Sequence, residues 1–441
     1  MTNTGLVIQQ DDAADLSAYA YSYPHKSSYR PLSPPASIAE AWQNEDLRQL
    51  SLYVHIPFCE MRCGFCNLFT QSQPDGGIVA AYLAALIRQM NVIRAAVPGA
   101  TFSQFAIGGG TPTFLSASQL EELLGSVESV FGQPLSRLPT SVETSPATAT
   151  VDRLQVLAKH GVQRLSMGVQ TFSPTDARHF GRPQNSDEVH RAIHAIQGFG
   201  RFELNLDLMY GHPEQTRDSW RDSLERALQY RPHEMYLYPL YVRPNTGLAK
   251  RGVFAERHRV DLYQEACDYL ASAGYEQLSL RCFRQPHKGK PVAYACQRDG
   301  MIGLGCGARS YTQALHYATR FAVTQAGIRA IVKDWIALRD DEFALATHGL
   351  WLSAEEQVRR YVILSLLQVE GLCCREFSER FPGTNLDELS GIAELKKRGW
   401  LVSVDGRERL TSIGLEHSDE VGPLLYSVSV RESLRKFVAG S

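Results

Sequence analysis

Three cysteines lie within eight residues in the segment Ser51-Leu-Tyr-Val-His-Ile-Pro-Phe-Cys59-Glu-Met-Arg-Cys63-Gly-Phe-Cys66-Asn-Leu-Phe69. Three thiolates cannot saturate a cubane of four irons, so one iron stays open for a cofactor or a substrate. A zinc site is an alternative, although zinc usually has four nitrogen or sulfur ligands and shorter loops between paired ligands. The cysteines could also be redox thiols or buried apolar residues. The spacing alone favours an iron–sulfur cluster over these alternatives.

The length and composition of the whole chain limit the classes of protein to which it can belong. Its 441 residues predict a large domain with a smaller one, and 44% hydrophobic with 21% charged residues is typical of a soluble globular protein. A net charge of -2 gives no reason to expect nucleic acid as a partner. We find no signal peptide and no apolar run long enough for a membrane span. With nine cysteines, an odd number, we expect reduced thiols, a cytoplasmic location and no membrane partner.

Strand-like and helix-like segments alternate between about residues 50 and 310. The β-rich apolar runs are Leu52–Phe58, Phe102–Ile107, Thr140–Glu143, Arg164–Val169, Leu204–Tyr210, Met235–Val242 and Gln277–Cys282. The helical periodicities are Val79–Ala96, Ala117–Phe131, Val151–Lys159, Ser186–Gln197, Arg217–Gln229 and Arg257–Ser272. This alternation predicts a parallel sheet with helices outside it, either open or closed into a barrel.

Several chemically active side chains follow these predicted strands. Cys59 follows the first strand, and Gly108-Gly-Gly-Thr-Pro-Thr113 follows the second. Glu143 ends the third, Gln170 ends the fourth, and Asp207 lies within the fifth. Because ligand sites in such folds cluster at the carboxyl ends of the strands, we expect one shared site.

Each of these residues also has a purely structural interpretation. The glycine run could be a tight turn rather than a backbone surface facing a ligand. Glu143 and Asp207 could form structural salt bridges or caps, since charged residues in apolar strands are rarely buried unless paired. Gln170 could be a hydrogen-bonded strand end. Arg182, in Phe180-Gly-Arg-Pro, could bind a carboxylate through two parallel bonds or be a surface arginine.

The two ends of the chain differ from this middle region. We predict an N-terminal arm over residues 1–48, where Arg30-Pro-Leu-Ser-Pro-Pro35 looks extended rather than part of the core, followed by a core over 49–320. A C-terminal domain over 330–441 has predicted helices at Ser353–Leu367 and Leu386–Arg398 and a hairpin at 399–410. That order is winged-helix-like. Because no dense basic recognition helix is visible, a packing module is favoured over DNA binding.

These motifs resemble, in order and spacing, the oxygen-independent coproporphyrinogen oxidase-like (HemN-like) family of the radical S-adenosylmethionine (SAM) superfamily. The resemblance covers about residues 18 to 425. It rests on Tyr53-Val-His-Ile-Pro-Phe58, the cysteine triplet, the Gly-Gly-Gly-Thr-Pro-Thr run, Gly303-Leu-Gly-Cys-Gly-Ala-Arg-Ser-Tyr311 and Leu410-Thr-Ser-Ile-Gly414. It implies an α/β fold, a radical SAM partial (β/α)6-type barrel with an N-terminal arm and a small winged-helix-like α+β domain.

The resemblance also implies the cofactors and their ligands. A [4Fe-4S] cluster would be held by Cys59, Cys63 and Cys66, and one or two SAM molecules would bind. The family's SAM-contacting positions fall on Tyr53, Phe65, Gly109, Gly110, Thr111, Glu143, Gln170, Arg182 and Asp207, with Tyr241 and Arg309 matched less closely. The reduced cluster would cleave SAM to methionine and a 5'-deoxyadenosyl radical that removes hydrogen from a small-molecule substrate. An electron donor such as flavodoxin or ferredoxin is implied, and we expect a monomer.

The sequence departs from the family pattern at several places. Cys306 and Arg309 replace alanine and histidine, and the run Cys66-Asn-Leu-Phe lacks the extra cysteine that true coproporphyrinogen oxidases tend to carry. Cys282 and Cys306 are either accessory thiols or small buried residues, and Cys373-Cys374 is taken as structural. Decarboxylation of a porphyrinogen, methylation with a second SAM, and tetrapyrrole ring opening stay open, as does a haem-binding chaperone without turnover.

The N-terminal arm carries a further hypothesis. Aromatic and basic residues gather in ten positions, which suits an anionic or tetrapyrrole-like substrate; they are Tyr21, Tyr23, His25, Lys26 and Arg30. Tyr23 is the candidate catalytic residue, expected beside the cysteines if the arm closes over the barrel mouth. A solvated arm is the alternative.

Overall fold

The computed structural model describes residues 22–182, 184–254, 259–286 and 300–439. The chain divides into two compact units. We call Arg30–Glu276 with Arg281–Trp351 the barrel unit, and Met1–Tyr29 with Gln277–Leu280 and Leu352–Ser441 the C-terminal unit. This division places residues 30–48 with the barrel strands rather than in a separate arm. Tyr21 of the proposed substrate arm lies outside the described residues.

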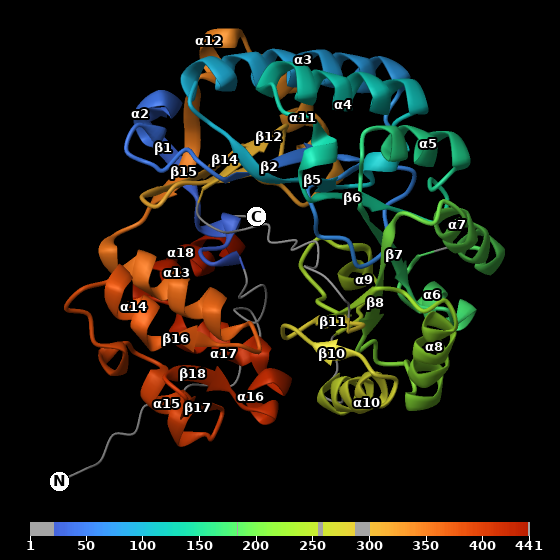
Figure 1. The fold of residues 1–441 in the computed structure, drawn as a ribbon, viewed down its shortest axis with the longest axis vertical. Helices are drawn as coiled ribbons and strands as arrows, with labels where there is room; N and C mark the ends of the chain where they lie inside the picture. Colours follow the sequence, from blue (N-terminus) through green and yellow to red (C-terminus); the bar gives the residue numbers. More distant parts are fainter. Residues whose placement is uncertain (1–21, 183, 255–258, 287–299, 440–441) are drawn as a thin grey trace. The chain divides into compact units, whose positions relative to one another are not determined.

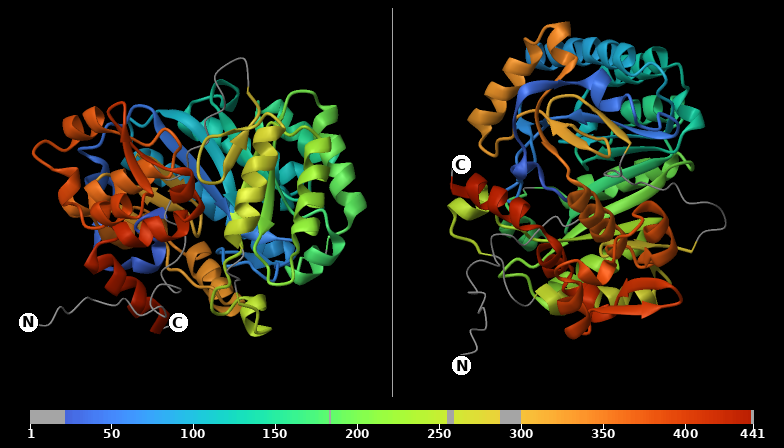
Figure 2. Two further views of the ribbon diagram at one scale, coloured as in Figure 1. Left: turned by 90° about the horizontal axis from the view of Figure 1, so that it is seen from below. Right: turned by 90° about the vertical axis from the view of Figure 1, so that its left-hand side faces the viewer.

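Six parallel strands in succession form the centre of the barrel unit (Figure 1). They are β2 (Leu50–Ile56), β5 (Phe102–Gly109), β6 (Thr140–Thr144), β7 (Arg164–Gln170), β8 (Glu203–Tyr210) and β9 (Glu234–Pro239). Helices between them lie outside the sheet in all views (Figure 2); they are α3 (Gly76–Ala96), α4 (Ala117–Phe131), α5 (Val151–Lys159), α6 (Pro174–His179), α7 (Ser186–Gly198) and α8 (Arg217–Gln229). The predicted partial (β/α)6-type barrel is confirmed.

Further strands extend this sheet at both ends. Beside β2 follow β12 (Met301–Leu304), which is parallel to it, then antiparallel β13 (Arg309–Tyr311), β14 (Leu315–Ala318), β15 (Leu345–Trp351) and β1 (Arg30–Ser37). Beyond β9 come β11 (Cys282–Arg284) and β10 (Glu276–Gln277). The remaining elements of the unit are α2 (Ile38–Trp42), β3 (Phe58–Cys59), β4 (Gln71–Ser72), η3 (Pro112–Phe114), η4 (Leu135–Arg137), α9 (Gly247–Lys250), α10 (Arg259–Ser272), α11 (Gln325–Ile336) and α12 (Asp340–Phe343).

The edges of the sheet differ from the predictions in two places. The proline-rich stretch 30–35 is extended and none of its residues is buried, as expected, but it pairs with β15 as the edge strand β1, where prolines are tolerated because one side of the strand needs no donor. The predicted strand Gln277–Cys282 is instead split between β10 and β11, with residues 278–281 outside both.

Apolar side chains on both faces explain why the central strands are buried. Val54, Ile107, Val142, Leu165 and Leu206 are fully or almost fully buried members of one core. Each contributes about 1.5–3 kcal/mol to folding by leaving water. The helices that cover them begin at local signals: Ser116 and Gln119 form a capping box at α4, so the first-turn N–H groups are satisfied.

Helix α3 differs from a sequence expectation. It is the one helix in the described ranges that is long and apolar enough to cross a membrane by length and composition, whereas no such run was expected. Its buried residues, including Tyr82, Leu86 and Met90, belong to the hydrophobic core. A core helix passes the same test of length and composition.

The C-terminal unit contains the predicted first helix and hairpin, but α14, which the sequence analysis did not predict, lies between the two predicted helices. Its elements are η2 (Lys26–Ser28), α13 (Ala354–Leu366), β16 (Leu372–Cys373), α14 (Cys374–Arg380), η5 (Leu386–Glu388), α15 (Ile392–Lys397), β17 (Leu401–Val404), β18 (Arg407–Leu410), α16 (Ser412–Glu416), α17 (Ser418–Leu425) and α18 (Val428–Ala439). The predicted helix Leu386–Arg398 is a 3-10 turn followed by the shorter α15.

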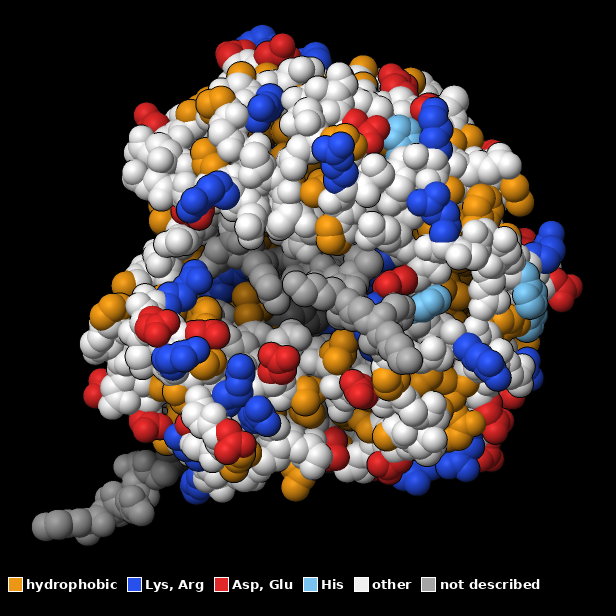
Figure 3. All heavy atoms as spheres, viewed as in Figure 1, with side chains coloured by type: hydrophobic (Ala, Val, Ile, Leu, Met, Phe, Trp, Pro, Cys, Tyr) orange, Lys and Arg blue, Asp and Glu red, His pale blue; other side chains and the backbone are white. Residues whose placement is uncertain are grey.

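Acidic and basic side chains are interspersed on the face shown in Figure 3, which agrees with the low net charge.

Candidate functional site

The three cysteines follow the first parallel strand, in a loop that is tied to the next strand. Cys59 lies on β3, and the N–H of Gln73 donates to its carbonyl at 2.9 Å. The glycine turn after β5 is joined to the same segment, because the Thr111 N–H donates to the Phe58 carbonyl at 2.8 Å. All three cysteines are free and half-buried.

Each cysteine sulfur has a polar neighbour. The Thr111 hydroxyl donates to Sγ of Cys59 at 3.5 Å, Arg182 Nη1 donates to Sγ of Cys63 at 3.1 Å, and the Thr70 hydroxyl lies 3.6 Å from Sγ of Cys66. Burial raises the pKa of Cys59 and Cys63 above the usual thiol range, while the Thr111 bond and the Arg182 charge oppose that rise. These donors favour thiolates, the form that binds iron.

This donor set fits a cluster. Among the described residues, no three His, Cys, Asp or Glu side chains gather closely enough to hold a single metal ion. A cubane does not require such a close group, because its three thiolates bind three different irons. Three half-buried sulfurs, two of which accept a bond from a donor and the third of which lies beside the Thr70 hydroxyl, suit that larger group.

Gly181 and Gly247 lie against the cysteine loop at Gly64. The Gly64 N–H donates to the Gly181 carbonyl at 2.9 Å, and the Leu248 N–H donates to the Gly64 carbonyl at 2.8 Å. A Cβ on Gly181 would lie 2.9 Å from Cα of Gly64, and a Cβ on Gly247 would lie 3.1 Å from the same atom. The loop between Cys63 and Cys66 is therefore fixed by backbone contacts that leave no room for side chains.

The glycine run after β5 makes room for a carboxylate. A Cβ on Gly108 would lie 2.7 Å from the Glu143 carboxylate, and the Gly109 N–H donates to Glu143 Oε2 at 3.0 Å. Gly109 has φ of 115°, and a Cβ there would strike the His55 ring. The glycine run therefore packs around Glu143 of β6, and this contact joins the turn after β5 to the next strand of the site.

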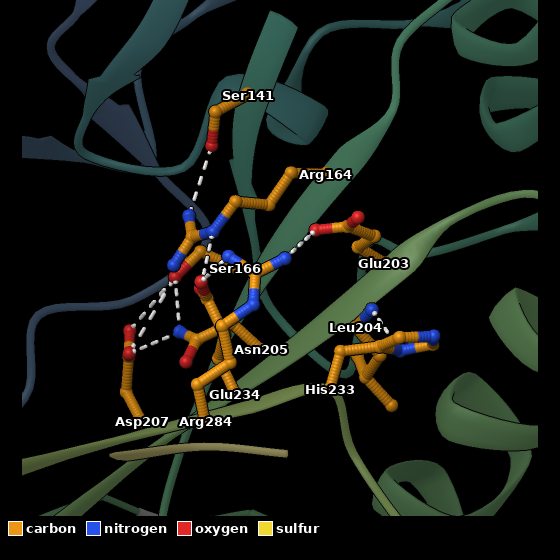
Figure 4. Close-up of polar contacts among 10 residues, drawn as sticks. All are labelled: Ser141, Arg164, Ser166, Glu203, Leu204, Asn205, Asp207, His233, Glu234 and Arg284. Atoms are coloured by element: carbon orange, nitrogen blue, oxygen red, sulfur yellow. Dashed lines mark hydrogen bonds and ion pairs between the residues drawn. The ribbon is translucent and has the colours of Figure 1, made fainter. Parts of the chain in front are cut away.

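Glu143 and Asp207 are poised near neutrality. Burial, with a smaller contribution from Asp207, raises the pKa of Glu143 to about 7, and burial raises the pKa of Asp207 to about 6. Asn205 Nδ2 donates to Asp207 at 2.7 Å, and the Ser166 hydroxyl lies 3.4 Å from it (Figure 4). Both carboxylates keep some exposed surface, so a ligand can reach them.

A buried ion network that the sequence analysis missed lies beside Asp207 (Figure 4). Arg164 Nε donates to Glu234 at 2.7 Å, and Arg284 donates to both Glu234 and Glu203 at 2.7 Å. The positive Arg164 lowers the pKa of Asp207 and so opposes the effect of burial. A charged residue inside an apolar strand, the signal used for Glu143 and Asp207, would also have found Arg164 and Glu234.

Gln170 carries two signs of a ligand site. Its φ is 70°, a left-handed conformation that costs an ordinary side chain about 1–2 kcal/mol. Its Oε1 atom is buried and accepts no hydrogen bond from the residues that the structure describes. A bound ribose hydroxyl would satisfy that acceptor, so the site has a feature that fits SAM.

The other predicted SAM contacts are spread along the sheet. Tyr53 is on β2, and its hydroxyl lies 3.1 Å from His55 Nδ1; Phe65 packs edge-on against Phe180. Tyr241 follows β9. Arg309 is on β13, two strands from β2, with its guanidinium 5.7 Å from the Tyr311 ring. These residues and Gly110 stay predicted contacts.

Tyr23 lies in the C-terminal unit, in a structural environment. Its hydroxyl donates to Glu356 and accepts from the Ser427 N–H at 3.3 Å, and its ring packs on Tyr426 at 5.0 Å. Its side chain is only 1% exposed. These contacts give Tyr23 a role in the packing of the C-terminal unit. A catalytic role for Tyr23 stays a prediction.

Comparison with known proteins agrees with this geometry. The profile described as the radical SAM superfamily matches residues 53–227. An oxygen-independent coproporphyrinogen III oxidase from Paracoccus denitrificans is 30% identical over 366 residues, covering 78% of each chain. The haem chaperone HemW of Escherichia coli is 30% identical over 277 residues, or 59% of this chain and 70% of that one.

A solved structure shows the same fold. The coproporphyrinogen III oxidase HemN of Escherichia coli superposes with a TM-score of 0.77 at 23% identity, covering 91% of this chain and 97% of that one. The parallel barrel with its cysteine loop defines a radical SAM protein. Within that superfamily, the chain belongs to the oxygen-independent coproporphyrinogen III oxidase-like (HemN-like) family. Membership implies SAM and a [4Fe-4S] cluster as cofactors.

Proposed function

We propose that the protein is a radical SAM enzyme that acts on a tetrapyrrole-type substrate. When bound, the cluster supplies the electron for reductive cleavage of SAM into methionine and a 5'-deoxyadenosyl radical. The observation that carries the proposal is that each of three cysteine sulfurs has a polar side chain beside it, at the strand ends that also hold Glu143 and Gln170. The protein itself binds and orients SAM and the substrate and excludes water from the site.

Individual residues have distinct tasks in this proposal. Cys59, Cys63 and Cys66 hold the cluster, with Arg182 and Thr111 stabilising two of the thiolates. The ionised carboxylates accept hydrogen bonds from SAM, whose ammonium and sulfonium groups are cationic. The free amide oxygen of Gln170 accepts a further bond. With the cluster and SAM held by these residues, the carboxyl end of β9 is left for the substrate.

The names of the relatives support the substrate class. Coproporphyrinogen and haem are both tetrapyrroles, and proteins named for each are about 30% identical to this chain. We further propose a cytoplasmic setting and a flavodoxin-like or ferredoxin-like electron donor. Analysis of the reaction product distinguishes oxidative decarboxylation from methylation and from ring opening.

One experiment tests the enzymatic activity. The anaerobically reconstituted protein is mixed with SAM and dithionite, and 5'-deoxyadenosine is measured by chromatography. We expect sustained formation that is lost in Cys63→Ala and kept in Cys373→Ala, since Cys373 lies in the C-terminal unit. A wild-type protein with four irons and no deoxyadenosine would contradict the proposal.

A haem-binding chaperone is the second candidate. The similarity to HemW is as high in identity as that to the oxidase, and the run Cys66-Asn-Leu-Phe lacks the extra cysteine of the oxidases. Haem added to the reconstituted protein would then bind and stay intact during incubation with SAM and dithionite. Haem loss or a modified tetrapyrrole in the mass spectrum supports the enzyme instead.

A further inference from the structure

Exposed cations lie around the point where the cysteine loop meets the backbone of two other loops. Arg178 lies on α6, Lys250 ends α9 and Arg251 follows it, and all three side chains are exposed. The Arg251 guanidinium joins the two helices, because its Nη2 atom donates to the His179 carbonyl at 3.1 Å. We call Arg178, Lys250 and Arg251 the cationic rim.

The cationic rim lies against the loop that carries the cluster cysteines. A Cβ on Gly64 would lie 3.1 Å from Arg251 Nη2, and a Cβ on Gly181 would lie 2.9 Å from the same atom. Gly64 stands between Cys63 and Cys66 in the chain, so this guanidinium touches the backbone of the cysteine loop itself. A positive charge that reaches water is therefore held directly on the loop.

At Gly247 the protein surface reaches the cysteine loop through glycine backbone. Gly247 is exposed, and a Cβ there would lie 3.1 Å from Cα of Gly64. The Leu248 N–H donates to the Gly64 carbonyl at 2.8 Å. Because glycines permit close approach of one backbone to another group, a protein docked on Gly247 would come near the cysteine loop.

The cationic rim keeps its charge available to a partner. Arg178 Nη2 donates to the Thr175 hydroxyl at 3.0 Å, and no residue of the rim forms an ion pair with the part of the chain that the structure describes. Two acidic side chains belong to the same segments: Glu214 is paired with His179 at 2.8 Å, and Asp176 is buried. The exposed charge around Gly247 is therefore positive.

The surface under the cationic rim is preformed. A small apolar core lies beneath it, and Phe65 of the cysteine loop and Val253 pack against that core, which consists of Phe180, Met209, Leu240 and Leu248. The next residue along the chain, Phe254, is 79% exposed. Aromatic and arginine side chains are enriched in protein–protein interfaces, so this composition fits a docking surface.

Reductive cleavage of SAM needs an electron from outside the protein. We propose that the cationic rim, with Gly247 and Phe254, is the docking surface for an acidic one-electron carrier protein. One electron leaves the reduced carrier and reduces the cluster, and no bond forms or breaks. The inference deepens the proposed function and rests on it for the need of an electron.

Charge complementarity identifies the class of partner. A negatively charged carrier surface is attracted to the cationic rim, which raises the rate of productive encounters. Electron-transfer contacts are among the smallest protein interfaces, so a few charges around one short approach are sufficient. A flavodoxin, an acidic carrier of this class, is the probe for the test.

The rate at which reduced flavodoxin reduces the cluster tests the docking surface. Stopped-flow absorbance follows this reaction in the wild-type holoprotein and in the double variant Arg178→Glu with Lys250→Glu. At about 0.01 M salt, where the Debye length is about 30 Å, we expect the double variant to react about tenfold more slowly or less. At about 1 M salt, where that length is about 3 Å, the two rates should converge. Arg251 is left unchanged because it also contacts the His179 carbonyl.

A matched double variant makes the same charge change at the other edge of the sheet. Arg137 and Arg201 are exposed and precede β6 and β8, so they lie at the amino ends of the parallel strands, opposite the cysteine loop. Arg137→Glu with Arg201→Glu should keep the wild-type rate with flavodoxin. Dithionite, a small reductant that needs no docking surface, should reduce the cluster of every variant to the same extent.

Several outcomes overturn the docking surface. Equal rates with flavodoxin in the wild type and in the rim variant at low salt do so. Equal slowing of both double variants does so too, because it would assign the effect to net charge. A wild-type cluster that dithionite reduces and flavodoxin does not is the third. If the rim variant loses iron, Lys250→Glu alone still reports.

Failure of the proposed function is distinguishable from failure of this inference. Rim-dependent reduction by flavodoxin without deoxyadenosine formation from SAM contradicts the enzyme and keeps the docking surface. Deoxyadenosine formation with dithionite, together with flavodoxin rates that do not depend on the rim, keeps the enzyme and overturns the docking surface.

Discussion

Lowering the pH should weaken SAM binding steeply, because two carboxylates of the proposed site titrate close to neutrality. Burial raises the pKa of Glu143 to about 7 and that of Asp207 to about 6. If both must be ionised, the competent fraction rises about 100-fold between pH 5.5 and 7.5. The SAM affinity of the wild-type protein should rise by a similar factor, measured by equilibrium dialysis on the anaerobic holoprotein.

Glu143→Gln isolates the two ionisations. The amide keeps the shape and can still accept the Gly109 N–H bond, but only Asp207 then titrates. We expect about a fourfold change over the same pH range. At pH 7.5 the loss of one charged partner should lower the affinity about tenfold or more.

The contribution of these two carboxyl groups to the free energy of unfolding of the SAM-free protein should change in the opposite direction, and fall as the pH rises. The folded-state pKa of each carboxyl group is raised above its ordinary value, so folding favours the protonated form. This contribution is present below the ordinary pKa near 4 and is lost as the pH rises through 6 to 7. A thermal melt of the SAM-free protein should therefore show this contribution falling, and the fall should be smaller in Glu143→Gln. Parallel pH profiles of SAM affinity in wild type and Glu143→Gln would refute the reasoning.

Three other changes have expected outcomes. Gly247→Ala should reduce iron incorporation, because a Cβ there would lie 3.1 Å from Gly64; Gly125→Ala, in open space on α4, should not. Tyr23→Phe should lower the free energy of unfolding of the C-terminal unit by about 1–3 kcal/mol in a urea titration, with iron content unchanged, since it loses bonds to Glu356 and Ser427; an unchanged unfolding midpoint would contradict this. Arg182→Gln should make the cluster potential more negative in a redox titration followed by electron paramagnetic resonance, because a positive donor leaves Sγ of Cys63; an unchanged potential would contradict the role of that contact.

Much of the barrel could be predicted from the chain because periodicity and strand order are local signals. The predicted bounds of α4, α5 and α8 agree with the structure, and each begins after a Ser or Thr cap residue. The extension from β12 to β1 was not predicted, because β12, β13 and β14 are short and because β12 and β1 pair with β2 and β15 across large separations in sequence. Prolines in 30–35 also hid the edge strand, since an edge position tolerates them.

The residues of the candidate site also differ in whether the sequence could predict them. Cys59, Glu143 and Gln170 could be found because each lies at or just after the end of a strand of clear pattern. The contacts of Gly64 with Gly181 and Gly247 depend on loops that meet only in the fold. The same is true of Arg243, Arg259 and Arg281, whose guanidinium groups lie around the Tyr241 ring. Loop convergence has no periodic signature, so only the coordinates could supply it.

The most direct test of the central claim is the electron paramagnetic resonance spectrum of the reduced, reconstituted protein with and without SAM. An open iron on a cluster held by Cys59, Cys63 and Cys66 predicts about four irons and four sulfides per chain and a spectrum that SAM changes. Cys63→Ala should lose that SAM-sensitive signal. A zinc-loaded protein without sulfide, or a four-iron spectrum that SAM leaves unchanged, would contradict the claim.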